Sequence, residues 1–150
     1  MNILIIEDNK CKYKNIEDTL NRVVDNPSIT WKQSRNSGLM AIMEHNFINT
    51  NELSTFDMVV CDNYLPIYDD GWKTESFGQD IVEEVRKRFK LTDLPIVMCS
   101  SEDVGEFDYN YKIRYDSSVI MDGMFKSIID DIVAKNDNSN NHVLTKEMNK

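Results

Sequence analysis

Short apolar runs alternate with segments of helical periodicity along most of this chain. Four runs have the length of strands: residues 2–6, 56–61, 94–99 and, with a more polar pattern, 28–33. Between them, apolar side chains fall on one face of a helix in residues 10–25, 37–47 and 78–90. Neighbouring parallel strands need a crossover connection, which is usually a helix. The alternation therefore predicts a parallel sheet with helices on both faces.

The remaining chain adds a fifth strand and a last helix. Residues 109–115 alternate aromatic or aliphatic side chains with polar ones, which is typical of a strand. Residues 116–135 carry N-cap candidates followed by an apolar stripe. Residues 101–108 show little apolar periodicity, so we expect the helix before the fifth strand to be reduced. We predict one domain over residues 1–135 and a mobile tail over residues 136–150.

Composition excludes some classes of partner. The formal charge is −9, whereas non-specific nucleic-acid binding needs clustered Lys and Arg. No segment approaches the roughly 18 apolar residues that span a bilayer. We therefore expect protein partners or a cation, neither nucleic acid nor membrane, and a cytoplasmic location.

Acidic side chains follow two of the predicted strands. Glu7 and Asp8 end the first strand and Asp62 ends the third, while Ser100 ends the fourth. Ligand sites of open parallel sheets lie beyond the carboxyl ends of the strands, so we expect these side chains to meet there. Two carboxylates about 4 Å apart repel each other by about 4 kcal/mol at an effective dielectric constant near 20.

A divalent cation would remove this repulsion, and an all-oxygen site suits Mg²⁺. We predict Asp8 and Asp62 as direct ligands, Glu7 as a ligand through water, and the backbone carbonyl of Tyr64 as a further ligand. A carboxylate beside Mg²⁺ can also attack an activated phosphoryl group, which makes Asp62 a candidate phosphoacceptor. The hydroxyl of Ser100 could donate to the transferred oxygens.

Three segments together resemble the receiver domain of two-component response regulators: LIIEDN (4–9), VVCDNYLP (59–66) and PIVMCSS (95–101). The resemblance covers about residues 2–135 and implies a CheY-like, flavodoxin-like fold with strand order 2-1-3-4-5. It also implies that Glu7 and Asp8 are the acidic pair that binds Mg²⁺, that Asp62 accepts phosphate from a histidine kinase or phosphotransfer protein, and that Ser100 is the switch hydroxyl.

The chain departs from the family pattern after the phosphoacceptor. The best match to the family's helix-opening glycine is Gly78, sixteen residues after Asp62. A long loop, residues 67–77, is left beside the site. It could serve as a lid or partner contact, or be a tolerated surface insertion.

A second departure concerns the lysine that the family places at the end of its fifth strand before a proline. No Lys-Pro pair occurs in this chain. Matching YKIR (111–114) to the family pattern makes Tyr111 the aromatic switch and Arg114 the cation, with Lys112 and Lys126 as alternatives. Arginine would offer bidentate phosphate contacts but a different geometry.

These features favour a stand-alone phosphoacceptor domain that signals to a downstream protein. We expect it not to be an enzyme, apart from catalysing its own phosphotransfer and dephosphorylation. Two alternatives are open. One is a pseudo-receiver that is never phosphorylated. The other is a Mg²⁺-dependent phosphohydrolase of the haloacid dehalogenase type, which would need a second acid where Tyr64 stands.

Overall fold

A five-stranded parallel sheet with the order β2-β1-β3-β6-β7 forms the centre of the protein. The computed structural model describes residues 1–48, 55–70 and 75–148. Its parallel strands are β1 (Asn2–Ile6), β2 (Ser28–Lys32), β3 (Met58–Cys61), β6 (Ile96–Ser100) and β7 (Tyr111–Arg114). The predicted strand order and edge position of residues 28–33 are confirmed.

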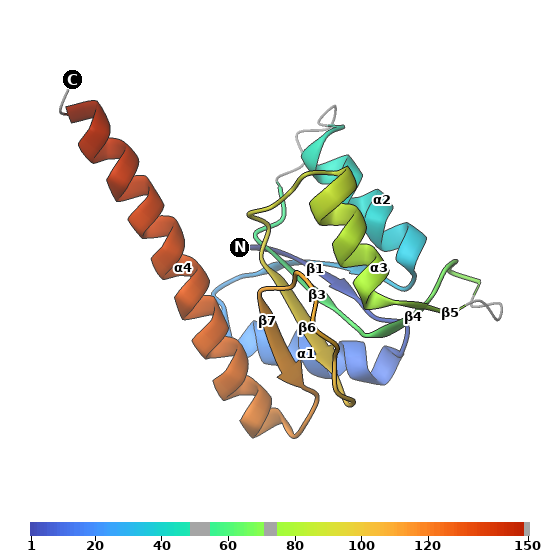
Figure 1. The fold of residues 1–150 in the computed structure, drawn as a ribbon. Coiled ribbons are helices and arrows are strands. Elements are labelled where there is room, and N and C mark those ends of the chain that lie inside the picture. The colour runs from blue at the N-terminus through green and yellow to red at the C-terminus, as the bar shows by residue number, and fades with distance from the viewer. Residues whose placement is uncertain (49–54, 71–74, 149–150) are drawn as a thin grey trace.

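Helices cover both faces of the sheet, as predicted (Figure 1). On one face lie α1 (Lys10–Val23) and α4 (Ser118–Met148), and on the other α2 (Arg35–Asn46) and α3 (Gly78–Glu83), which continues as the π-helical segment η2 (Glu84–Arg88). Successive residues of β1 serve both layers, since Ile3 and Ile5 pack towards α1 and α4 while Leu4 and Ile6 pack towards α2 and α3. Strands buried on both faces explain the continuous apolar runs of the sequence.

The long last helix packs by one stripe only. Met121, Phe125 and Ile129 are buried, whereas Met124 and Val133, which the sequence assigned to the same stripe, are 38% and 44% exposed. The helix runs on to Met148, past the sheet (Figure 1). Residues 136–148 are therefore helical, and their mobility stays a prediction.

No helix lies between β6 and β7, where residues 101–110 are all described. The helix that we expected to be reduced is therefore absent from this described segment. Phe107 and Tyr109 pack against the core instead, with their ring centroids 4.9 Å apart. The buried guanidinium of Arg86, in η2, donates to the Asp108 carbonyl at 3.1 Å, and to the Asn110 side chain at 2.7 Å. The first of these bonds gives the Asp108 carbonyl a donor in a segment where no helix supplies one.

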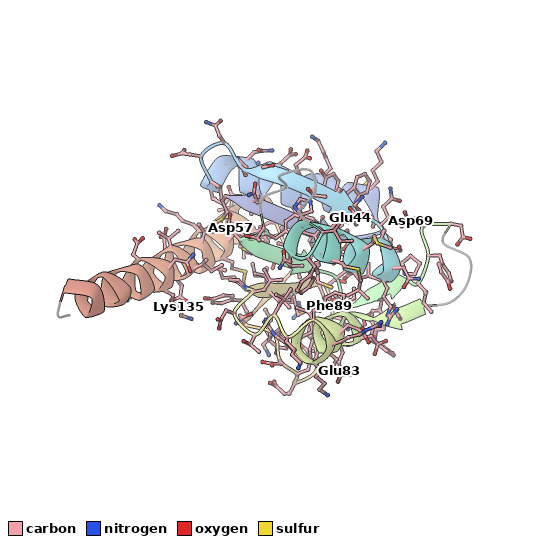
Figure 2. The ribbon with its side chains drawn as sticks, turned by 90° about the horizontal axis from the view of Figure 1, so that it is seen from above. Glu44, Asp57, Asp69, Glu83, Phe89 and Lys135 are labelled. Atoms are coloured by element: carbon pink, nitrogen blue, oxygen red, sulfur yellow. The ribbon has the colours of Figure 1, made fainter. Side chains whose placement is uncertain are left out.

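A short antiparallel hairpin, not predicted from the sequence, follows β3. Its strands are β4 (Tyr64–Pro66) and β5 (Glu75–Phe77), so part of the predicted loop 67–77 is a strand. Residues 71–74 of that loop lie outside the described residues. The first part of the loop is fixed to the start of α2, because the Ser34 hydroxyl donates to Asp69 at 2.6 Å. Seen from above, Asp69 lies at the side of the molecule opposite the far end of α4 (Figure 2).

Among the described residues, no helix is both long enough and apolar enough to cross a membrane.

Candidate functional site

Three carboxylates meet at the carboxyl edge of the sheet, as the sequence predicted. One oxygen from each of Glu7, Asp8 and Asp62 lies within 4.8 Å of the others. Strand register explains the meeting, since Ile6 of β1 pairs with Cys61 of β3, and the acids follow these two residues. The carboxylates line an open cavity of about 730 Å³, together with Ser100 and Tyr64.

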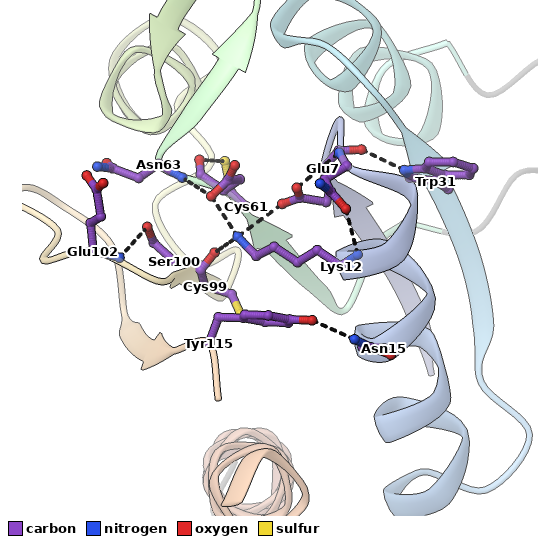
Figure 3. A network of polar contacts seen from close by, with 12 residues as sticks. Glu7, Lys12, Asn15, Trp31, Cys61, Asn63, Cys99, Ser100, Glu102 and Tyr115 are labelled. Carbon is purple, nitrogen blue, oxygen red and sulfur yellow. Dashed lines mark hydrogen bonds and ion pairs between the residues drawn. The ribbon is translucent and has the colours of Figure 1, made fainter. Parts of the chain in front are cut away.

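A lysine from α1 bridges two of these acids, and this contact was not predicted. The Lys12 ammonium lies 2.8 Å from Asp62 Oδ1 and 3.2 Å from Glu7 Oε2 (Figure 3). It also donates to the carbonyl of Cys99 at 2.8 Å. The available sequence signal was positional: α1 starts directly after the acidic end of β1, capped by Asn9, which brings its first turn to the same edge.

Burial and mutual charge set the ionisation of this cluster. Burial raises the pKa of Glu7, 2% exposed, to about 7, and the nearby Asp62 charge acts in the same direction. Burial also raises the pKa of Asp8. Burial alone would lower the pKa of Lys12, but Asp62 and Glu7 more than offset this and hold it above its ordinary value. Lys12 therefore stays charged and offsets one of three possible negative charges.

The two oxygens of Asp62 differ in their surroundings. Oδ1 accepts hydrogen bonds from Lys12 and, at 2.8 Å, from the backbone of Asn63. Among the described residues, no donor contacts Oδ2. One oxygen is thus held in place while the other is available for a metal ion or an electrophile.

Ser100 and Tyr64 line the same cavity from neighbouring strands. Ser100 is 3% exposed, and its hydroxyl oxygen accepts a bond from the backbone of Glu102 at 3.2 Å. Tyr64 opens β4, which turns the chain away from Asp62 along the cavity wall. Asp69 also lines the cavity, so the segment after β4 forms part of its wall.

The cations predicted on the fifth strand and the last helix lie away from these acids. Arg114 is exposed and does not line this cavity, and its role as the phosphate-binding cation stays a prediction. Lys112 lies 4.0 Å from Glu106, and Lys126 is exposed on α4. Tyr111 hydrogen-bonds Asp131 on α4. The next residue after β7, Tyr115, lines the cavity, whereas Tyr111 does not.

A tryptophan lies directly behind the acidic pair. The indole of Trp31 donates to the Glu7 carbonyl at 2.7 Å (Figure 3). Its ring stacks on Tyr13 of α1, with centroids 4.0 Å apart and planes 3° from parallel. Trp31 therefore touches the backbone of a predicted metal ligand, and its fluorescence can report on the site.

Comparisons with known proteins find similar folds among solved structures. No family model matches the sequence, and no curated protein does either. A phosphorylated cyanobacterial phytochrome response regulator, RcpA, is 20% identical, with a TM-score of 0.63 over 85% of this chain and 89% of that one. The Mn²⁺-bound response regulator Rcp1 is 17% identical, with a TM-score of 0.60 over 85% and 90%.

The chemotaxis response regulator CheY4 of Vibrio cholerae is 13% identical, with a TM-score of 0.61 over 85% of this chain and 97% of that one. These matches cover most of each protein, so the similarity extends to the whole sheet and its helices and not to one motif. This chain has the fold of response-regulator receiver domains.

Proposed function

We propose that this protein is a phosphoacceptor signalling domain, which receives a phosphoryl group on Asp62 from a histidine kinase or phosphotransfer protein. The observation that carries the proposal is the meeting of Glu7, Asp8 and Asp62 in one open cavity. Because the phosphoryl donor must approach in line with an Asp62 oxygen, the open cavity and an Oδ2 that no donor of the described chain contacts both favour this reaction.

The donor set fits a divalent cation such as Mg²⁺. All three side chains offer oxygen atoms within 4.8 Å of one another, and Lys12 offsets only part of their charge. Asp8 and Asp62 would hold the ion directly, Glu7 through water, and the Tyr64 carbonyl would complete the protein ligands. When bound, the ion would offset negative charge on the transferred phosphoryl oxygens.

The remaining chemistry belongs to the chain. An oxygen of Asp62 attacks phosphorus, a P–O bond forms, and the P–N bond to the donor imidazole breaks as that nitrogen takes up a proton. The Ser100 hydroxyl, whose oxygen accepts from the Glu102 backbone, would then donate its proton to a phosphoryl oxygen. Signalling would follow through altered contacts with a downstream protein.

One observation favours the alternative of a phosphorylation-independent interaction module: the Lys12–Asp62 ion pair already offsets the charge of the acceptor. A buried pair in a closed cleft would block transfer. Here Asp8 is exposed, Asp62 keeps 14% of its side chain exposed and the cavity is open, so a donor can reach the acceptor. The phosphohydrolase alternative gains no support, since no carboxylate stands at position 64.

Intact-mass spectrometry tests the proposal. The protein is incubated with phosphoramidate, a small donor with a P–N bond, with and without Mg²⁺. Wild type should gain the mass of one phosphoryl group only with Mg²⁺, and Asp62→Asn should gain none. A wild-type protein that gains no mass at any Mg²⁺ concentration, although Trp31 fluorescence reports a folded site, would support the interaction module instead.

A further inference from the structure

One ammonium group joins three elements at the site. Lys12 extends from the first turn of α1 to Asp62, at the end of β3, and to the carbonyl of Cys99 in β6. Its side chain is only 13% exposed, and an ammonium offers three donors. The contacts with Asp62, Glu7 and Cys99 use all three, so Lys12 is held in one position while Asp62 is unmodified.

Phosphorylation would change the balance of these contacts. A phosphoryl group adds about 1.5 to 2 negative charges at neutral pH and three strong acceptor oxygens. Lys12 is the one basic residue among the described residues that line the cavity. Since its Nζ already lies 2.8 Å from the Asp62 oxygen, a small rotation brings it to a phosphoryl oxygen, and the neutral carbonyl of Cys99 is the weakest of its three acceptors.

Tyr115 is placed to respond to that movement. The Lys12 ammonium lies 5.5 Å from the centroid of the Tyr115 ring, within range of a cation–π contact. The backbone of Tyr115 donates to the carbonyl of Ser100 at 2.9 Å, and its hydroxyl accepts from Asn15 of α1 (Figure 3). Tyr115 is therefore bonded both to the predicted switch residue and to the helix that carries Lys12.

We propose that Lys12 is the phosphate-binding cation of this protein, and that its displacement transmits the phosphorylation of Asp62 to α1 and Tyr115. The proposal rests on the function proposed above. It differs from the expectation for Arg114, because the cation is carried by a helix and not by the last strand. The responsive surface would then include the start of α1 and the residues around Tyr115.

Four variants separate the candidates. Lys12→Ala removes the proposed cation, Arg114→Ala removes the competing one, and Lys10→Ala removes an exposed charge from the same helical turn. Lys12→Gln keeps a hydrogen-bond donor without the charge, and serves if Lys12→Ala fails to fold. Measurements are phosphoryl gain from phosphoramidate by mass, and amide hydrogen exchange with and without Mg²⁺ and beryllium fluoride.

Lys12→Ala and Lys12→Gln should gain phosphoryl at least about tenfold more slowly than wild type. They should also lose the change in hydrogen exchange that beryllium fluoride produces in α1 and at Tyr115. Arg114→Ala and Lys10→Ala should behave as wild type. The assignment would be overturned if the Lys12 variants gained phosphoryl at the wild-type rate and kept the wild-type change in hydrogen exchange. It would also be overturned if Arg114→Ala lost both. Either result would leave phosphorylation of Asp62 intact. A wild type that takes up no phosphoryl would instead refute the proposed function.

Discussion

Gly78 touches the backbone of the candidate phosphoacceptor, and Gly78→Ala tests how closely α3 positions it. A Cβ atom at Gly78 would lie 2.4 Å from the carbonyl oxygen of Asp62 and 2.6 Å from the Met98 methyl carbon. Ordinary contacts begin at 3.4 Å, so Asp62 or the start of α3 must move by about 1 Å. The Met98 side chain can rotate away, but the backbone of Asp62 is fixed by the sheet.

Overpacking of this kind costs about 1–3 kcal/mol. For a chain of this size, about 2 kcal/mol lowers the Tm by about 4–8 °C. A 1 Å displacement of a reacting group can cost about 100-fold in rate, so phosphoryl gain from phosphoramidate should fall by about that factor.

Gly123→Ala is the matched control, because a Cβ at this exposed position in α4 meets nothing within 4 Å. It should raise the stability by about 0.5–1 kcal/mol through helix propensity and leave phosphoryl gain unchanged. The two substitutions add the same methyl group, but one site is crowded and the other open, so calorimetry should show that they shift the Tm in opposite directions. The proposed close contact would be refuted if the Tm of Gly78→Ala lay within about 1 °C of the wild-type Tm and the variant were phosphorylated at the wild-type rate.

Three further predictions concern the residues around the site and the missing helix. Arg86→Met should lower the free energy of unfolding in urea by about 3 kcal/mol, because it removes the side-chain donor of the Leu91 and Asp108 carbonyls and one of the two donors to Asn110 Oδ1. A loss below about 1 kcal/mol would show that water replaces the guanidinium. The pKa of Glu7 is about 7 in the folded protein and ordinary in the unfolded chain, so the metal-free protein should lose up to about 3 kcal/mol of stability as the pH rises from 4.5 to 7. Glu7→Gln should flatten this dependence of stability on pH. Equal slopes in both proteins would assign the dependence to other groups. Lys12→Ala should bind Mg²⁺ about tenfold more tightly, since the ammonium competes with the ion for Asp62 and Glu7. A fluorescence titration in a Trp72→Phe background, which leaves Trp31 as the reporter, measures the affinity, and an unchanged affinity would place the ion elsewhere.

The sheet was predictable because its strands carry their signal locally. Runs such as Ile3–Ile6 are apolar on consecutive residues, and helical segments follow the first three strands, so parallel order and two-sided burial follow from the chain itself. The meeting of Glu7, Asp8 and Asp62 was predictable for the same reason, since parallel register brings strand ends to one edge.

The source of the cation was not predictable in the same way. Lys12, Lys10 and Lys14 all lie in the first turns of one helix, and only the packing of α1 against the sheet selects the one that points into the cavity. The hairpin of β4 and β5 escaped prediction because each strand has only three residues, too few to show a period. Matching YKIR to the family pattern favoured Tyr111, which lies at the start of β7, whereas Tyr115, the residue after the carboxyl end of β7, lines the cavity.

The absence of a helix between β6 and β7 constrains how a structural change at Ser100 could be transmitted to the protein surface. Residues 101–110 have no helix that could move as a unit, and Arg86 fixes the end of this segment to η2. The strand pair β6–β7 leads instead from Ser100 to Tyr115, which is bonded to α1. From there α1 contacts α4 through the ion pair of Arg22 and Asp122 at 2.8 Å. A change at Asp62 that moves Lys12 therefore acts directly on α1 and, through this ion pair, on α4, so partner-binding substitutions are best sought on the face of these two helices.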